Sequence, residues 1–221
     1  FSSIHMGITA ENIAYEYNIS REEMDKFALD SQNKAMAAVK AGLFKGQIVG
    51  IEVKKNRKIT IFEEDEHIKP NTTIENLASL RAAFKSDGLV TAGNSSGIND
   101  GTSSIVLANE EVSKMAKSAP LARIVSYGFG GVAPNIMGMG PVPASKMALE
   151  KAKLKISALD LIESNEAFAA QACAVSKALK LPQQKVNPNG GAIALGHPIG
   201  ATGAIILTKL VHELIRTKGR Y

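Results

Sequence analysis

The stretch NGGAIALGHPIGATG, residues 189–203, is the most constrained piece of this sequence. Its five glycines let the backbone turn tightly and approach a ligand closely, because glycine has no Cβ atom. Pro198 disfavours helical backbone at His197, so we expect a turn to present the imidazole. Apolar residues at helical spacing from Ile205 onward predict a helix that opens near Gly200. A strand, a glycine-rich turn with a titratable group and a helix N-terminus form a common catalytic arrangement in α/β enzymes.

Two interpretations of His197 follow from this context. An ordinary histidine is often half-buried and hydrogen-bonded to backbone without any chemistry. The flanking glycines and proline favour the functional interpretation instead. A Walker-type phosphate loop is excluded, because no lysine followed by Ser or Thr comes after the glycines of GHPIGATG.

Composition indicates a globular protein of one or two domains. The 221 residues are 45% hydrophobic, which is enough for a sizeable core. The net charge of +5 suits an anionic ligand such as a nucleotide-bearing thioester, although the lysines are scattered along the chain. The sequence contains neither an apolar run of membrane-spanning length nor a charged-then-apolar leader, so we expect a cytoplasmic protein.

The single cysteine, Cys173, rules out an internal disulfide. The few histidines are far apart in sequence, which argues against a structural zinc site. They are His5, His67, His197 and His212. The chain begins with Phe1 and ends with Tyr221 directly after a predicted helix, so we expect it to be incomplete at both ends.

The region before residue 96 lacks a repeated βα pattern. Its expected elements are a helix capped by Thr9 that ends near Tyr17, a helix from the Ser20–Glu23 capping box to Gly42, strands at Ile48–Lys54 and Lys58–Phe62, and a helical turn at Ile74–Leu80. This pattern predicts an inserted lobe of helices with a small hairpin.

Strands and helices alternate after Asn99. The expected strands are Ser103–Ala108, Leu121–Tyr127, Leu159–Glu163 and a short one near Val186. The expected helices are Glu110–Lys117, one with Pro143 in its first turn that runs to about Lys153, Ala167–Lys180 and the helix from Gly200. Such alternation predicts a mainly parallel sheet with helices on its faces. GFGGVA, residues 128–133, fits a dinucleotide-binding pattern, but Pro134 follows where a helix should begin.

A family resemblance emerges from five blocks taken in order. SNEAFAAQACAV at residues 164–175 and the stretch at 189–203 resemble the paired signatures of thiolases, in particular the acetyl-CoA acetyltransferase branch. Three further blocks agree in order and spacing: HMGITAEN at 5–12, TAGNSSGINDG at 91–101 and MGMGPVPAS at 137–145. The resemblance covers nearly the whole chain.

The resemblance implies the α/β thiolase-like fold, in which two stacked βαβαβαββ halves form αβαβα layers with an inserted α+β loop domain. Residues 1–98 then map to the loop (cap) domain, 99–120 to the closing segment of the N-terminal core half, and 121–221 to the C-terminal core half without its last strands. On this mapping only the loop domain and most of the second half are present. Leu121–Tyr127 would then lack a neighbouring strand and form an unpaired apolar edge.

The resemblance also implies an acyltransferase that condenses two acetyl-CoA to acetoacetyl-CoA and CoA, or runs the reverse thiolysis, through an acyl-cysteine. This chemistry needs a nucleophile, a base and donors for two oxyanions. His197 matches the histidine that deprotonates the nucleophile, a task that suits an imidazole. Asn165 matches the asparagine that holds the oxyanion-hole water, although it could also be a helix N-cap ahead of Glu166.

The residues expected along the acyl-CoA tunnel are carried over from the same motifs. They are Ser96, Gly97, His5, Met6, Phe84, Met137 and Phe168. Core packing is the alternative for the methionines and phenylalanines, and a turn role is the alternative for Ser96. The coenzyme A thioester is the substrate, so we expect no cofactor and no metal.

The chain departs from the family in its cysteines. The acyl-carrying cysteine and the second reactive cysteine are expected upstream and downstream of these residues, and Cys173 sits inside an alanine-rich helix where a thiol is inert. We therefore expect the chain to be inactive alone. The alternatives are a degradative 3-ketoacyl-CoA thiolase and a CoA-binding fragment without turnover. The family further implies a homodimer or homotetramer in fatty acid metabolism, with no nucleic-acid or membrane partner.

Overall fold

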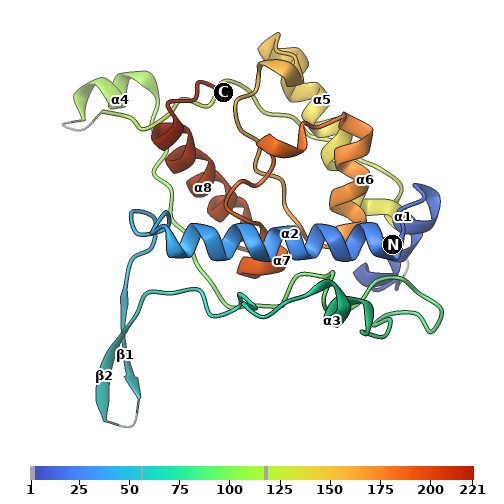
Figure 1. Ribbon diagram of the computed structural model, residues 1–221. Helices are drawn as coiled ribbons and strands as arrows, with labels where there is room; N and C mark the ends of the chain where they lie inside the picture. The colour runs from blue at the N-terminus through green and yellow to red at the C-terminus, as the bar shows by residue number, and fades with distance from the viewer. Residues whose placement is uncertain (1–2, 56, 117–118) are drawn as a thin grey trace.

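The computed structural model describes residues 3–55, 57–116 and 119–221, and the long helix α2 crosses the middle of the molecule (Figure 1). The α-helices are α1 (Met6–Glu16), α2 (Arg21–Lys40), α3 (Ile74–Ala78), α4 (Glu110–Met115), α5 (Pro141–Ala152), α6 (Ala169–Leu179), α7 (Ala192–Leu195) and α8 (Thr202–Thr217). The 3-10 helices are η1 (Pro134–Met139), η2 (Ile156–Ala158) and η3 (Gln183–Lys185), and the strands are β1 (Ile51–Lys55) and β2 (Lys58–Phe62). No helix in this described part combines the length and apolarity needed to cross a bilayer.

Helix α2 begins and ends as its sequence predicts. Ser20 Oγ accepts a hydrogen bond from the Glu23 N–H at 3.2 Å and so caps the helix. Gly42, just beyond the helix, has φ of 69°, a left-handed conformation in which a side chain would be strained. The buried residues Met24 and Ala28 belong to the main core, and α2 packs against α3, α6 and α7. Helix α2 therefore packs against one helix that follows it in the first half of the chain and two from the second half.

Helix α1 begins earlier than predicted, so the expected Thr9 cap is wrong. His5 Nδ1 accepts a hydrogen bond from the Gly7 N–H at 3.0 Å and acts as the N-cap. Thr9 lies inside the helix, where its hydroxyl donates to the Met6 carbonyl at 2.7 Å. The ring nitrogen of His5 thus accepts the bond that Ser, Thr, Asn or Asp usually accepts.

The predicted hairpin is confirmed, and it projects away from the helices (Figure 1). Strands β1 and β2 are antiparallel, with Ile51 opposite Phe62 and Val53 opposite Thr60. These four side chains share one face because alternate residues of a strand point the same way. The face is exposed, with Ile51 at 54% and Phe62 at 46%.

The predicted parallel sheet does not form within the described residues. Segments 103–108, 121–127 and 159–163 contain no strand ladder, and a single parallel bridge joins Ile162 to Val186. A strand is defined by backbone hydrogen bonds to a neighbour, and among the described residues the first two segments make none. Leu121 is 67% exposed, as expected for an unpaired apolar edge, and Val106 is 93% exposed.

The longer helices of the C-terminal region are α5, α6 and α8. Helix α5 begins at Pro141, so Pro143 lies in its first turn as predicted, where a proline is tolerated because the N–H groups there have no partner within the helix. Helix α6 is buried around most of its circumference, as its apolar sequence predicts, and it contacts α1, α2 and α5. The segments that carry Asn165 and His197 lie just before α6 and α8.

Candidate active site

His197 lies in a turn between α7 and α8 that is held from two sides. The backbone N–H of His197 donates to Asn99 Oδ1 at 3.1 Å, and ring atom Nδ1 lies 2.7 Å from Thr202 Oγ1. Gly196 has φ of 98°, and a Cβ there would lie 2.6 Å from Asn99 Oδ1. The turn therefore requires glycine for both its conformation and its contact with Asn99. Burial lowers the pKa of His197, which favours the neutral imidazole.

Residues 94–99 lie between the segments that carry the two candidate catalytic residues. Both the backbone N–H and the hydroxyl of Ser96 donate to the Ala167 carbonyl, at 3.1 and 2.9 Å. On the other side, Ile98 pairs with His197 in a parallel bridge. One extended segment thus joins the residues that follow Asn165 to the turn that carries His197.

Asn165 stands in the extended segment before α6. The N-cap alternative for Asn165 is wrong, because α6 begins at Ala169 with Phe168 as its N-cap residue. Within the described residues, the buried Oδ1 atom of Asn165 has no hydrogen-bond partner. Buried polar atoms are nearly always paired in native proteins, so this amide is a candidate for contact with a ligand or water.

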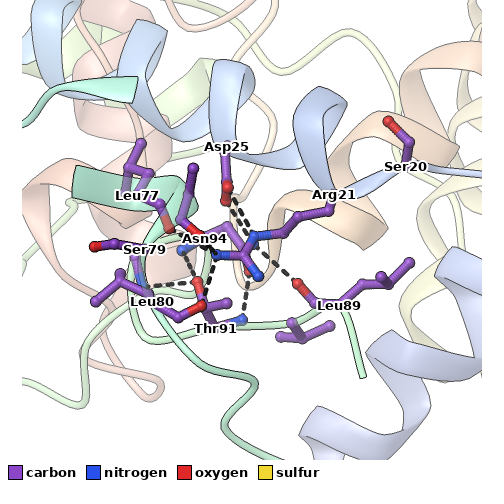
Figure 2. A network of polar contacts seen from close by, with 12 residues as sticks. Ser20, Arg21, Asp25, Leu77, Ser79, Leu80, Leu89, Thr91 and Asn94 are labelled. Carbon is purple, nitrogen blue, oxygen red and sulfur yellow. Dashed lines mark hydrogen bonds and ion pairs between the residues drawn. The ribbon is translucent and has the colours of Figure 1, made fainter. Parts of the chain in front are cut away.

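A polar network anchors residues 94–99 to α2 (Figure 2). Asp25 is buried; its Oδ2 accepts from Arg21 Nε at 2.7 Å and its Oδ1 from Asn94 Nδ2 at 2.9 Å. Arg21 also donates to the carbonyls of Leu77 and Leu80, at 2.6 and 2.8 Å. Asn94 and the loop before it are therefore fixed to the helix by bonds to a charged group, which are stronger than neutral ones.

Three of the predicted substrate-binding residues form an aromatic cluster. The rings of His5 and Phe84 are stacked with centroids 5.0 Å apart, and Phe84 meets Phe168 edge-on at 5.9 Å. A Cβ at Gly7 would lie 2.2 Å from the Phe84 ring, so position 7 in the first turn of α1 must be glycine for the ring to fit. His5, Phe84 and Phe168 come together from three distant parts of the sequence.

The other predicted substrate-binding residues are more dispersed. Met6 is 48% exposed, and Met137 is 39% exposed on η1, which packs against α1 and α6. Gly97 faces the imidazole of His67, since a Cβ there would lie 2.3 Å from ring atom Cε1. An open hollow is lined by residues 80–83 and Ala92, and neither His197 nor Asn165 lines it.

Glu166 fastens the glycine-rich loop from within the core. It is buried and accepts from Ser31 Oγ at 2.6 Å, Asn187 Nδ2 at 2.8 Å and the Ile193 N–H at 3.2 Å. Burial raises the pKa of Glu166, and these donors oppose the rise. A Cβ at Gly191 would lie 2.1 Å from the carboxyl carbon, so the chain passes directly over this group.

Lys209 of α8 ties the same loop to the segment of Asn165. Its ammonium lies 2.8 Å from Glu163 Oε2 and donates to the Gly190 carbonyl at 2.6 Å. The side chains of Lys209 and Glu163 are only 6% and 2% exposed. Burial raises the pKa of Glu163, and the nearby ammonium lowers it to a smaller extent.

Cys173 is not available as a nucleophile. It is buried in α6, and burial raises the pKa of the thiol to about 12, so almost none of it is thiolate near neutral pH. No group of three or more His, Cys, Asp or Glu side chains suited to a metal ion occurs in the described ranges. The candidate catalytic groups among the described residues are therefore the imidazole of His197 and the amide of Asn165.

Sequence analysis missed three residues that hold the site. Asn99 lies inside the quoted TAGNSSGINDG block, but nothing in that block signals a bond to a backbone 98 residues away. Thr202 follows His197 by five residues and contacts its ring. A hydroxyl side chain in the first turn of the helix after a histidine is a sequence signal from which this contact could be predicted. Glu166 stands in the sequence as the neighbour of Asn165, and the signal that could have found it is that a carboxylate in an apolar stretch must be paired if it is buried.

Comparisons with known proteins agree on one family. Residues 1–111 match the model described as thiolase, N-terminal domain, and residues 118–221 match thiolase, C-terminal domain. Beta-ketothiolase BktB of Cupriavidus necator is 55% identical over 222 residues, which cover 100% of this chain and 56% of BktB.

Solved structures give the same result. The crystal structure of the Bacillus anthracis acetyl-CoA acetyltransferase matches with a TM-score of 0.95 and 51% identity, over 97% of this chain and 55% of that one. Human mitochondrial 3-ketoacyl-CoA thiolase matches with a TM-score of 0.92 and 48% identity, over 98% and 55% of the two chains. This chain therefore spans little more than half the length of the relatives that it matches.

Proposed function

This chain belongs to the thiolase family and shares its α/β fold, and on that premise we propose that it forms part of an acetyl-CoA acetyltransferase. The proposed reaction condenses two acetyl-CoA to acetoacetyl-CoA and CoA, or runs the reverse thiolysis, through an acyl-cysteine. The observation that carries the proposal is the packing of residues 94–99 between the Asn165 segment and the His197 turn. That contact joins the two motifs that the chemistry requires.

In this proposal His197 takes the proton from the acyl-accepting thiol, and Asn165 helps to hold the developing oxyanion. A neutral imidazole can accept a proton, and the lowered pKa of His197 favours that form. The amide of Asn165 donates without a change of charge, and its unpaired oxygen leaves it free to engage a water. Ser96 and the cluster of His5, Phe84 and Phe168 would contact the thioester arm, together with Met6, Gly97 and Met137.

The acyl-carrying cysteine is expected in polypeptide outside the 221 residues, because the thiol of Cys173 is buried with a raised pKa. We also propose self-association as a dimer or tetramer, since the family implies it. Size-exclusion chromatography with light scattering measures that state directly.

A degradative 3-ketoacyl-CoA thiolase is the second candidate, favoured by the similarity to the human enzyme of that name. Thiolysis rates of the full-length gene product with acetoacetyl-CoA and with longer 3-ketoacyl-CoA distinguish the two. An acetyl-CoA acetyltransferase loses activity steeply beyond the four-carbon substrate. Equal or higher rates with long chains support the degradative enzyme and overturn the acetyl specificity.

A CoA-binding protein without turnover is the third candidate. Incubation of the full-length gene product with radiolabelled acetyl-CoA, followed by denaturation and peptide mapping, tests for a covalent acyl-cysteine. Label on a cysteine supports the transferase. Saturable coenzyme A binding with no covalent label overturns it.

A further inference from the structure

The hydroxyl group of Thr202 touches two groups at hydrogen-bond distance. Thr202 is the first residue of α8 and is buried, at 5% exposure. Its Oγ1 lies 2.9 Å from the Pro198 carbonyl oxygen and 2.7 Å from Nδ1 of His197. The hydroxyl therefore bridges the imidazole to the backbone of the turn that presents it.

A hydroxyl carries one hydrogen, and this decides which groups can donate. A carbonyl oxygen only accepts, so the contact with Pro198 is a hydrogen bond only when Thr202 donates to it. The same oxygen can then only accept from His197, so Nδ1 must carry a hydrogen. In the opposite arrangement, Thr202 donates to Nδ1 and two oxygens face each other at 2.9 Å with no hydrogen between them. A hydrogen on Nδ1 thus satisfies both contacts, and the opposite arrangement satisfies one.

We propose that Thr202 is a positioning residue that holds His197 as the Nδ1–H tautomer, so that Nε2 is the ring atom with a free lone pair. The hydrogen bond made by one ring nitrogen sets the state of the other. Asn99 fixes the backbone of the same residue, because its Oδ1 accepts a hydrogen bond from the His197 N–H. The backbone and the ring of His197 are each held by one neighbouring side chain.

The catalytic meaning of this tautomer rests on the proposed function. A histidine that takes a proton from a thiol must present a bare nitrogen to it, and Thr202 assigns that task to Nε2. The tautomer itself is a property of the folded chain in the absence of any substrate. It can therefore be measured whether or not the transferase proposal holds.

The test is long-range ¹H–¹⁵N NMR of the full-length gene product with ¹⁵N-labelled histidine, above the pH at which His197 titrates. Loss of one signal set in His197→Asn assigns the ring. The expected spectrum has a protonated Nδ1 and a bare Nε2. A protonated Nε2 in the wild-type chain overturns the proposal, and this result needs no variant to fold.

Two variants and a matched control test the cause. Thr202→Ser keeps the hydroxyl, so it should keep the Nδ1–H tautomer. Thr202→Val keeps the shape without the hydroxyl, so the ring should shift toward Nε2–H, which imidazole prefers when no contact intervenes. Thr208→Val makes the same change elsewhere on α8 and should alter nothing. An unchanged tautomer in a folded Thr202→Val chain overturns the proposal.

If the tautomer is found as expected but the full-length gene product forms no acyl-cysteine, the proposed function fails and this inference stands. If acyl transfer occurs while Nε2 is protonated in the resting chain, the inference fails and the function stands.

Discussion

Replacing Lys209 by methionine should destabilise the chain strongly, because it strands a buried carboxylate. Lys209 Nζ lies 2.8 Å from Glu163 Oε2, with the two side chains 6% and 2% exposed. Methionine fills similar space without the charge or the donor to Gly190. Removing one partner of such a buried pair costs about 3–5 kcal/mol, since the remaining charge has no counterion.

Urea unfolding measures the effect as a change in the free energy of unfolding. Lys114→Met is the matched control, because the Lys114–Glu110 pair on α4 is 73% and 83% exposed. An exposed pair contributes about 0–1 kcal/mol, so this control should be nearly neutral. The double variant Lys209→Met with Glu163→Gln removes the stranded charge and should be less damaging than the single change.

The pH dependence gives an independent check. Burial raises the pKa of Glu163, and loss of the Lys209 ammonium should raise it further. A carboxyl group whose pKa is higher in the folded state binds protons more tightly there, so stability grows as pH falls through the folded pKa toward the unfolded value. The deficit of Lys209→Met should therefore shrink in acid. A deficit no larger than that of Lys114→Met, or one that does not change with pH, would refute this reasoning.

Three further outcomes are expected. Gly191→Ala should lower the free energy of unfolding by about 1–3 kcal/mol in thermal or urea unfolding, because the new Cβ would lie 2.1 Å from the Glu166 carboxyl group. Gly200→Ala is the control, since a Cβ there enters open space and should change stability little. Equal effects of the two changes would contradict the packing. Cys173, whose pKa is raised to about 12, should resist alkylation at pH 8 until the chain unfolds, and rapid labelling of folded protein would show that the thiol is accessible. Burial lowers the pKa of His197, so its NMR titration should have a midpoint below 6.5. The contribution of His197 to folding stability should be lost as the pH falls below the pKa of the unfolded chain, because the unfolded state then binds the proton more readily. A midpoint above 6.5 would contradict the burial argument.

Local chemistry made part of this structure predictable. The Ser20 cap and Gly42 define α2 through bonds and backbone angles within a few residues of each other. The helix after the His197 turn followed in the same way from glycine, proline and apolar spacing. The thiolase fold was predicted from sequence blocks and is confirmed by the match to solved structures.

Contacts between distant segments could not be predicted from patterns. The bond from Asn99 to the His197 backbone and the clamp from Glu166 to α2 depend on how the chain folds back on itself. The predicted core strands failed for the same reason, since apolar alternation indicates a strand but not whether a neighbour is there to pair with it. His5 misled the assignment of α1 because an imidazole is an uncommon N-cap.

The most direct test of the central claim compares two histidine variants of the full-length gene product in acetoacetyl-CoA thiolysis. His197→Gln removes the proposed proton acceptor, whereas His212→Gln changes a histidine on α8 outside the candidate site. General-base removal should lower kcat by roughly 10²–10⁴-fold for His197→Gln, with His212→Gln close to wild type. Undiminished thiolysis by a folded His197→Gln protein would contradict the account.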